Sequence, residues 1–229
     1  MPTRANALAV MAKAPIPGAV KTRLVPPLTH EQAADLTRAL LQDQLEHLTE
    51  LGDVDLYLAF TPVDAASLVR SMVPASFQCF CQRGESLGER MSEVFAELWH
   101  RGHKRLVLIG SDLPAVPLNF FHDAYTVLNC EDKRVVFGPS QDGGYYLVGM
   151  NQPTPQMFER MTWSHDRVLV QTTEKLSGLK IAVKLLPTWF DIDTIEDLER
   201  LQTIADPAVR RAMKRTWVFL KQLNNSTST

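Results

Sequence analysis

The strongest constraint on the fold is an apolar run that ends at an acidic residue. Residues 106–110 (Leu-Val-Leu-Ile-Gly) are followed by Ser111 and Asp112, and Pro114 stands two positions further on. An unbroken apolar run is typical of a strand buried on both faces of a parallel sheet, and the proline ends it. Ligands of open α/β sheets bind beyond the carboxyl ends of the strands. Asp112 is therefore either a cation ligand at that edge or the cap of a helical turn.

The composition limits the classes of partner. The 229 residues are 45% hydrophobic and 22% charged, which suits one domain with one core. Lys and Arg (24) nearly balance Asp and Glu (26), so no nucleic-acid or membrane-surface binding is expected and any basic site must be local. The first apolar run is too short for a signal peptide, and no run is long enough for a membrane span. The three cysteines lack metal-site spacing. We expect a reduced, cytoplasmic, soluble protein.

Strands alternate with helices along the chain. Apolar runs predict further strands at residues 7–12, 54–60, 77–81, 134–138, 145–150 and 181–186. Helical spacing lies between most of them, and Asp142-Gly143 is a hairpin signal. We therefore predict a three-layer α/β sandwich with a mostly parallel mixed sheet, as a single domain over residues 1–223. The basic, amphipathic helix at 207–223 is predicted to be a solvated surface helix, and residues 224–229 a flexible tail.

The loop after the first strand is rich in cations. Lys13, Lys21 and Arg23 lie within eleven residues, together with two prolines and one glycine. The prolines stiffen the loop, Gly18 permits close backbone approach, and the three cations can converge on phosphate oxygens. Lys21 stands three residues after Gly18, so this is not a Walker-type loop. The alternative is a solvated basic loop.

Two later loops carry candidate ligand contacts. Gly84 and Gly88 lie where a strand turns into a helix, so they either admit a nucleotide base or serve a tight turn. Arg90 either reaches a phosphate or pairs with Glu93. Asp142 and the glycines after it suit sugar-like hydroxyls, although a hairpin alone would also explain them.

Two acids near the end of the chain complete the candidate site. Asp191 and Asp193 flank Ile192, so on an extended segment they share a face. Two carboxylates on one side need a cation or water between them. With Asp112 they form a plausible metal site. His165 is more typical of a structural or substrate-contacting histidine than of a metal ligand.

Five ordered motifs carry a family resemblance. They read Ala-Lys-Ala-Pro-x-Pro-Gly-x-x-Lys-Thr-Arg-Leu, Leu-Gly-Glu-Arg-Met, Gly-Ser-Asp-x-Pro, Gly-Pro-x-x-Asp-Gly-Gly-Tyr-Tyr-Leu-x-Gly and Asp-Ile-Asp-Thr-x-x-Asp-Leu. The chain resembles a bacterial glycosyltransferase-A-like family of the nucleotide-diphospho-sugar transferase superfamily, long labelled a domain of unknown function. That superfamily also holds 2-phospholactate guanylyltransferase and the molybdenum cofactor guanylyltransferase. Ser86 departs from the family pattern, which usually has Asp there.

The resemblance implies a fold and a set of roles. The fold is the Rossmann-like GT-A sandwich, and the cofactor is Mg²⁺ or Mn²⁺ bound by Asp112 and Asp193, with Asp191 a further candidate. Asp112, Asp142 and Lys21 are the implied catalytic residues. The implied nucleotide and sugar contacts are Lys13, Pro17, Gly18, Lys21, Thr22, Arg23, Gln82, Gly88, Arg90, Gly143, Gly144, Tyr145 and His165.

Three functions follow as hypotheses. The first is metal-dependent transfer of a glycosyl group from a nucleoside-diphosphate sugar to a small acceptor. The second is nucleotidyl transfer from a nucleoside triphosphate to a small phosphorylated substrate, which releases pyrophosphate. The third is a nucleotide-binding module without catalysis. The base, the sugar, the acceptor, the stereochemical outcome and the oligomeric state are not readable from the sequence.

Overall fold

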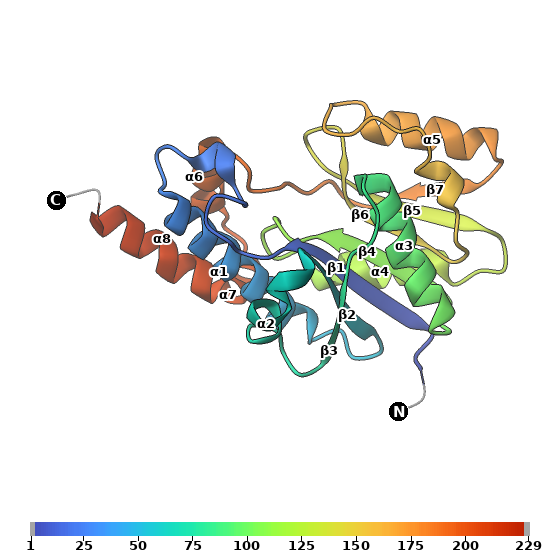
Figure 1. Ribbon diagram of the computed structural model, residues 1–229. Helices are drawn as coiled ribbons and strands as arrows, with labels where there is room; N and C mark the ends of the chain where they lie inside the picture. Colours follow the sequence, from blue (N-terminus) through green and yellow to red (C-terminus); the bar gives the residue numbers. More distant parts are fainter. Residues whose placement is uncertain (1–2, 227–229) are drawn as a thin grey trace.

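The computed structural model describes residues 3–226, and its centre is a seven-stranded sheet in the order β3-β2-β1-β4-β6-β5-β7 (Figure 1). The strands are β1 (Asn6–Lys13), β2 (Asp55–Thr61), β3 (Phe77–Cys81), β4 (Arg105–Gly110), β5 (Arg134–Pro139), β6 (Tyr145–Met150) and β7 (Ala182–Leu185). β6 runs antiparallel to β4 and β5, and the other neighbours are parallel. The predicted mixed, mostly parallel sheet is confirmed.

Helices cover both faces of the sheet. They are α1 (His30–Leu48), α2 (Ala66–Arg70), α3 (Leu87–His100), α4 (Leu118–Leu128), α5 (Val168–Gly178), α6 (Ile195–Thr203), α7 (Pro207–Ala212) and α8 (Lys214–Ser226), with short 3-10 turns η1 (Thr22–Leu24), η2 (Val63–Ala65) and η3 (Pro155–Met157). Side chains of β1 alternate between the faces. Leu8 and Val10 pack with α1 and α4, whereas Ala7 and Ala9 pack with α3 and α5. This is the predicted three-layer sandwich.

The last helices form a further layer beside α1, where Figure 1 shows α8 lying along it. Asp43 of α1 is 2% exposed, and its carboxylate accepts hydrogen bonds from the Thr216 backbone N–H and hydroxyl, both at 2.8 Å. Thr216 and Leu220 are buried. The predicted surface helix is present with one face exposed, but it is divided into α7 and α8. The structure adds that a buried carboxylate on α1 holds the first turn of α8.

The ends of the predicted domain also differ from expectation. Residues 224–226, assigned to a flexible tail, form the end of α8, and residues 227–229 lie outside the described part of the chain. The single-domain assignment of residues 1–223 stays a prediction. None of the helices between residues 3 and 226 combines the length and apolar character that crossing a membrane demands.

Candidate functional site

A cleft of about 540 Å³ opens where β1 and β4 end at their carboxyl edge. This is the edge at which an open α/β sheet binds ligands. Most of the sequence-predicted site residues line it, namely Lys13, Lys21, Thr22, Arg23, Gln82, Arg90, Asp112, Asp142, Gly144, Tyr145, His165, Asp191 and Asp193. Pro17, Gly18, Gly88 and Gly143 lie in the same loops but outside the lining.

The strand order separates the charges of the cleft. The lining cations come from the end of β1, from the loop after it and from α3, which follows β3. They therefore belong to the β3-β2-β1 half of the sheet. The lining acids come from the segment after β4, from the β5–β6 turn and from the segment after β7. These strands make up the other half of the sheet. One side of the cleft therefore suits anions, and the other suits cations or hydroxyls.

Lys21 is the point where the two halves meet. Its ammonium lies 2.8 Å from Asp112 Oδ1 and 3.9 Å from Asp193 Oδ1, and it donates a hydrogen bond to the Ile192 carbonyl. The Lys21 side chain is only 2% exposed, whereas those of Asp112 and Asp193 are 46% and 48% exposed. Lys21 thus contacts the predicted metal ligands instead of projecting freely toward a phosphate.

Helix α1 holds the loop that carries Asp112. Gln44 Nε2 donates to the Gly110 carbonyl at 3.1 Å, and His47 Nε2 donates to the Val116 carbonyl at 3.0 Å. These bonds fix the backbone on both sides of Asp112. Sequence reasoning missed Gln44 and His47, although the signal was there: they are polar residues three apart beside the apolar stripe of α1.

The segment after β7 docks on the same loop. The Ile192 N–H donates to the Asp112 carbonyl at 2.8 Å, and the Trp189 indole N–H donates to the Pro114 carbonyl at 3.2 Å. This pairing brings the two predicted halves of the metal site together across eighty residues of sequence. Trp189 also escaped the sequence reasoning, because no local pattern marks its partner.

Asp191 and Asp193 have different surroundings. Asp191 Oδ2 accepts a 2.5 Å hydrogen bond from the Ser140 hydroxyl. Burial raises the pKa of Asp191 to about 7, while the Ser140 bond opposes the shift and the nearby carboxylate of Asp142 adds to it. Burial also raises the pKa of Asp193, an effect that the Lys21 charge counteracts.

The predicted three-acid metal site is not preformed. Among residues 3–226, no group of three or more His, Cys, Asp or Glu side chains is arranged to hold a metal ion. The physical reasons are that Asp191 bonds to Ser140 and that the Lys21 ammonium lies between Asp112 and Asp193. Two half-exposed carboxylates are left, which fits a hard divalent ion that takes its remaining ligands from a phosphate and water.

The loop after β3 presents one amide to the cleft. Gln82 Nε2 donates to the carbonyls of Ala12 and Ala59, at 3.3 and 2.8 Å. Two carbonyl acceptors require the NH₂ group on that side, so the side-chain oxygen of Gln82 is left to accept from a ligand. Arg90 bonds to the Gly84 carbonyl at 3.0 Å and not to Glu93 as one alternative expected.

Gly88 is a packing residue. A Cβ there would lie 2.9 Å from the Phe158 carbonyl oxygen and 3.0 Å from the Trp163 ring. Glycine is therefore needed where α3 meets the segment after β6, and a nucleotide contact by Gly88 stays a prediction.

The β5–β6 turn is a hairpin with additional contacts. Asp142, which lines the cleft, accepts a hydrogen bond from the Gly144 N–H through Oδ1 at 2.9 Å, and this bond does not use its second oxygen. The Tyr145 hydroxyl is buried close to Thr172, and Tyr145 lines the cleft. His165 Nδ1 accepts from the Arg167 N–H at 3.1 Å, in keeping with a hydrogen-bonded structural histidine beside the cleft.

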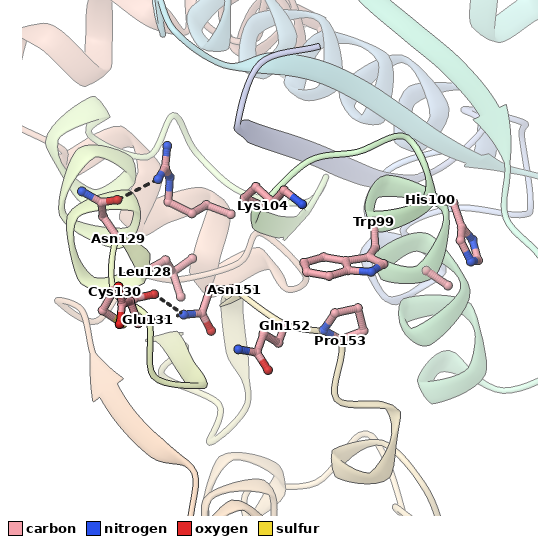
Figure 2. Close-up of a pocket in the computed structure, with 12 residues that line it drawn as sticks. Trp99, His100, Lys104, Leu128, Asn129, Cys130, Glu131, Asn151, Gln152 and Pro153 are labelled. Atoms are coloured by element: carbon pink, nitrogen blue, oxygen red, sulfur yellow. Dashed lines mark hydrogen bonds between the residues drawn. The ribbon is translucent and has the colours of Figure 1, made fainter.

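A larger cavity of about 880 Å³ lies at the opposite edge of the sheet (Figure 2). It contains none of the predicted site residues, and several of its polar groups pair with one another. The Asn129 side-chain oxygen accepts from Arg105, and the Asn151 amide donates to the Cys130 carbonyl. These groups are already satisfied, so the carboxyl-edge cleft is the better candidate site.

The fold and the placement of the cleft define a nucleotide-diphospho-sugar transferase fold. A solved structure from Desulfovibrio desulfuricans G20, provisionally assigned as a nucleotide-diphospho-sugar transferase, is 31% identical, with a TM-score of 0.89, 97% of this chain covered and 96% of that one. Residues 44–165 match the family described as "Uncharacterized protein conserved in bacteria (DUF2064)". The chain belongs to this family, which confirms the resemblance drawn from the motifs.

More distant structures share the fold. One is 4-diphosphocytidyl-2C-methyl-D-erythritol synthase from Anaerococcus prevotii DSM 20548, with 10% identity, a TM-score of 0.56, and 86% and 98% of the two chains covered. Another is the manganese complex of Rv0371c from Mycobacterium tuberculosis H37Rv, with 19% identity, a TM-score of 0.52, and 87% and 98% covered. No sequence among the curated proteins matches the chain.

Proposed function

We propose that the protein is a transferase that binds a nucleoside-diphosphate sugar in the carboxyl-edge cleft and passes the glycosyl group to a small acceptor. The observation that carries the proposal is the division of charge across the cleft, with cations on the β1 side and carboxylates on the β4–β7 side. A donor with a charged diphosphate and an uncharged sugar matches that division.

The donor half would lie on the β1 side. Lys13 and Arg23 are exposed cations of the β1 loop, and Arg90 faces the same cleft from the first turns of α3. Together they can bind diphosphate oxygens and stabilise the charge that develops on the leaving group. The Gln82 side-chain oxygen would accept a hydrogen bond from the base, and Trp163 offers an apolar ring in the same lining.

A divalent ion would sit at Asp112 and Asp193. Their carboxylates are half-exposed and both already contact one cation, which shows that the pair can share a positive charge. Such an ion would neutralise charge on the diphosphate. Mg²⁺ and Mn²⁺ both suit one or two carboxylates with phosphate oxygens, and the manganese complex of Rv0371c supports the use of a divalent ion.

The acceptor half would lie on the β4–β7 side. Ser140, Asp142 and Asp191 line it, and the described residues that follow β5 and β7 bring no cation to the lining. Carboxylates repel a phosphorylated or acidic acceptor but accept hydrogen bonds from hydroxyls. This favours glycosyl transfer to a hydroxyl-bearing acceptor over nucleotidyl transfer to a phosphorylated one. Asp142, which has an oxygen free of the turn, would contact that hydroxyl.

Ligand binding tests the proposal first. The purified protein is screened by thermal unfolding against nucleoside diphosphates, triphosphates and nucleotide sugars, with and without Mn²⁺ or Mg²⁺, since a ligand of the native state raises its melting temperature. We expect a metal-dependent shift with one diphosphate and its sugar conjugate. A preference for triphosphates, with pyrophosphate as product, would replace the proposal by nucleotidyl transfer. Tight binding without turnover would indicate a binding module.

A substitution then tests the acid. With the donor identified, Asp112→Asn should lower turnover by about 100-fold or more, because it removes one metal ligand and charge. The asparagine keeps a side-chain oxygen for Lys21, and circular dichroism checks that the fold is retained. Asp123→Asn, on the exposed side of α4, is the matched control and should keep full activity. Normal activity of Asp112→Asn would refute the assignment.

A further inference from the structure

We propose that Lys21 is a resident cation of the Asp112–Asp193 pair that excludes free divalent ions, so that the metal enters only together with a nucleotide. The inference rests on the proposed function for the nature of the later ligand. Its central measurement uses the metal alone. Lys21 would thereby act as a positioning residue for the two carboxylates.

The ammonium is held by protein oxygens through one hydrogen bond and two ion pairs, one close and one longer. A lysine ammonium has three N–H donors and no acceptor. Here it contacts three oxygens: Asp112 Oδ1 at 2.8 Å, the Ile192 carbonyl, and Asp193 Oδ1 at 3.9 Å. A side chain that projected into the cleft to wait for phosphate would be exposed, but this one is 2% exposed.

The backbone holds Lys21 in this place. Lys21 has φ 44° and ψ 40°, the left-handed region that non-glycine residues seldom adopt. The Leu24 N–H donates to the Lys21 carbonyl at 2.9 Å, and Leu24 is fully buried in the apolar cluster shared by η1, α1 and the last helices. An unfavourable backbone conformation persists only where its surroundings enforce it. The enforced conformation sends the Lys21 side chain inward to the two acids.

This arrangement disfavours a free metal ion. The ammonium supplies a positive charge where a divalent ion would bridge Asp112 and Asp193, so the two cations repel each other. Displacing Lys21 would also strip a buried ammonium of its acceptors, which is strongly unfavourable unless new ones replace them. Polyphosphate oxygens are such acceptors. Metal and nucleotide should therefore bind cooperatively, with the metal weak when alone.

Mn²⁺ binding tests the inference directly. Loss of the free Mn²⁺ electron paramagnetic resonance signal is titrated for wild type, Lys21→Met, Lys13→Met and Lys21→Met with Asp112→Asn. Lys13→Met is the matched control, since it removes one positive charge from the same cleft without freeing the acids. We expect Lys21→Met to bind Mn²⁺ at least tenfold more tightly than wild type, Lys13→Met to stay within about twofold, and the double variant to lose the gain.

Each outcome decides the inference. Equal Mn²⁺ affinity in Lys21→Met and Lys13→Met would overturn it, as would tight, saturable Mn²⁺ binding by the wild type alone. The wild-type titration holds even if Lys21→Met fails to fold, and Lys21→Gln provides a polar replacement whose fold is checked by circular dichroism. Failure of the nucleotide screen would count against the proposed function but would not change these titrations.

Discussion

At the scale of single residues, Asp191 is a cleft carboxyl whose ionisation the protein strongly alters. Its carboxyl is largely enclosed between the β5–β6 turn and the segment after β7, and burial raises its pKa to about 7. Ser140 partly stabilises the charged form. The Asp191 carboxyl therefore changes its charge near neutral pH. The carboxylates of Asp112, Asp142 and Asp193 lie nearby in the same cleft.

The stability of the protein should depend on pH through Asp191. Its pKa is about 3.9 in an unfolded chain and about 7 in the folded protein. Between these values the folded protein keeps a proton that the unfolded chain has lost, so the free energy of unfolding falls as pH rises through this window. Above about pH 7, the Asp191 carboxyl is ionised in the folded protein as well, and the loss of unfolding free energy reaches its maximum.

Asp191→Asn removes this contribution. In chelator-containing buffer we expect Asp191→Asn to be more stable than wild type at pH 8 by about 2 kcal/mol. The pKa shift of Asp191 implies roughly 4 kcal/mol, and we halve this figure because water reaches part of the carboxyl. The difference should vanish near pH 4. Urea unfolding at both pH values measures it, and a variant less stable than wild type at pH 8 would contradict the pKa shift.

At the scale of elements, the cleft walls are loops locked to one another. Gly143, at φ +86°, packs so closely on the loop before α5 that a Cβ would lie 1.9 Å from the Asp166 carbonyl oxygen. The Leu169 N–H donates to the Gly143 carbonyl at 3.0 Å. The hairpin that carries Asp142 and the loop that carries His165 are therefore one packed unit.

Gly143→Ala should separate these loops. The substitution combines the left-handed backbone penalty of about 1–2 kcal/mol with a backbone clash, for a total loss of about 2–4 kcal/mol. Gly102→Ala is the matched control, since Gly102 has φ +95° but nothing within 4 Å of the added Cβ. It should therefore cost only the backbone penalty of about 1–2 kcal/mol. Urea unfolding compares them. Equal losses would show that the contact with Asp166 is unimportant.

At the scale of the whole molecule, one apolar cluster supports both partners of the acid–ammonium contact. Leu24, next to the Lys21 turn, and Ile192, next to Asp193, belong to the cluster that includes α6, α7 and α8. The last helices thus hold the two sides of the cleft at a fixed separation. Asp43, buried under the start of α8, anchors this layer to α1.

Asp43→Asn should release the C-terminal layer. An amide NH₂ would replace one carboxylate oxygen and face donors of either Thr216 or Arg215. Either arrangement leaves donors unpaired, and we expect a loss of about 2–4 kcal/mol. Glu46→Gln is the control, because Glu46 pairs with the same Arg215 but its side chain is 55% exposed and should contribute below about 1 kcal/mol. Urea unfolding and hydrogen exchange of α8 amides measure both. Unchanged exchange in Asp43→Asn would refute the anchor.

Much of the architecture was predictable from local patterns. Unbroken apolar runs marked the buried strands, and the Asp142-Gly143 turn marked the antiparallel hairpin. Thr29 and Gln32, at the spacing of a capping box, form one at the start of α1. These features depend on hydrophobic periodicity and on hydrogen bonds within a few residues, so the sequence alone contains them. Alignment of parallel strands then places their carboxyl ends at one edge.

The sequence by itself determined the residue types of the cleft and the class of fold. Only the tertiary structure decided how those residues pair. It directed Lys21 to Asp112 and Asp193, Asp191 to Ser140, and Asp43 to α8. Each of these contacts joins segments that are distant in the chain. The interaction energy of each contact depends on how deeply the two groups are buried and on where the partner group lies. Periodicity and spacing describe neighbours along a chain, whereas charge pairing is set by neighbours in space.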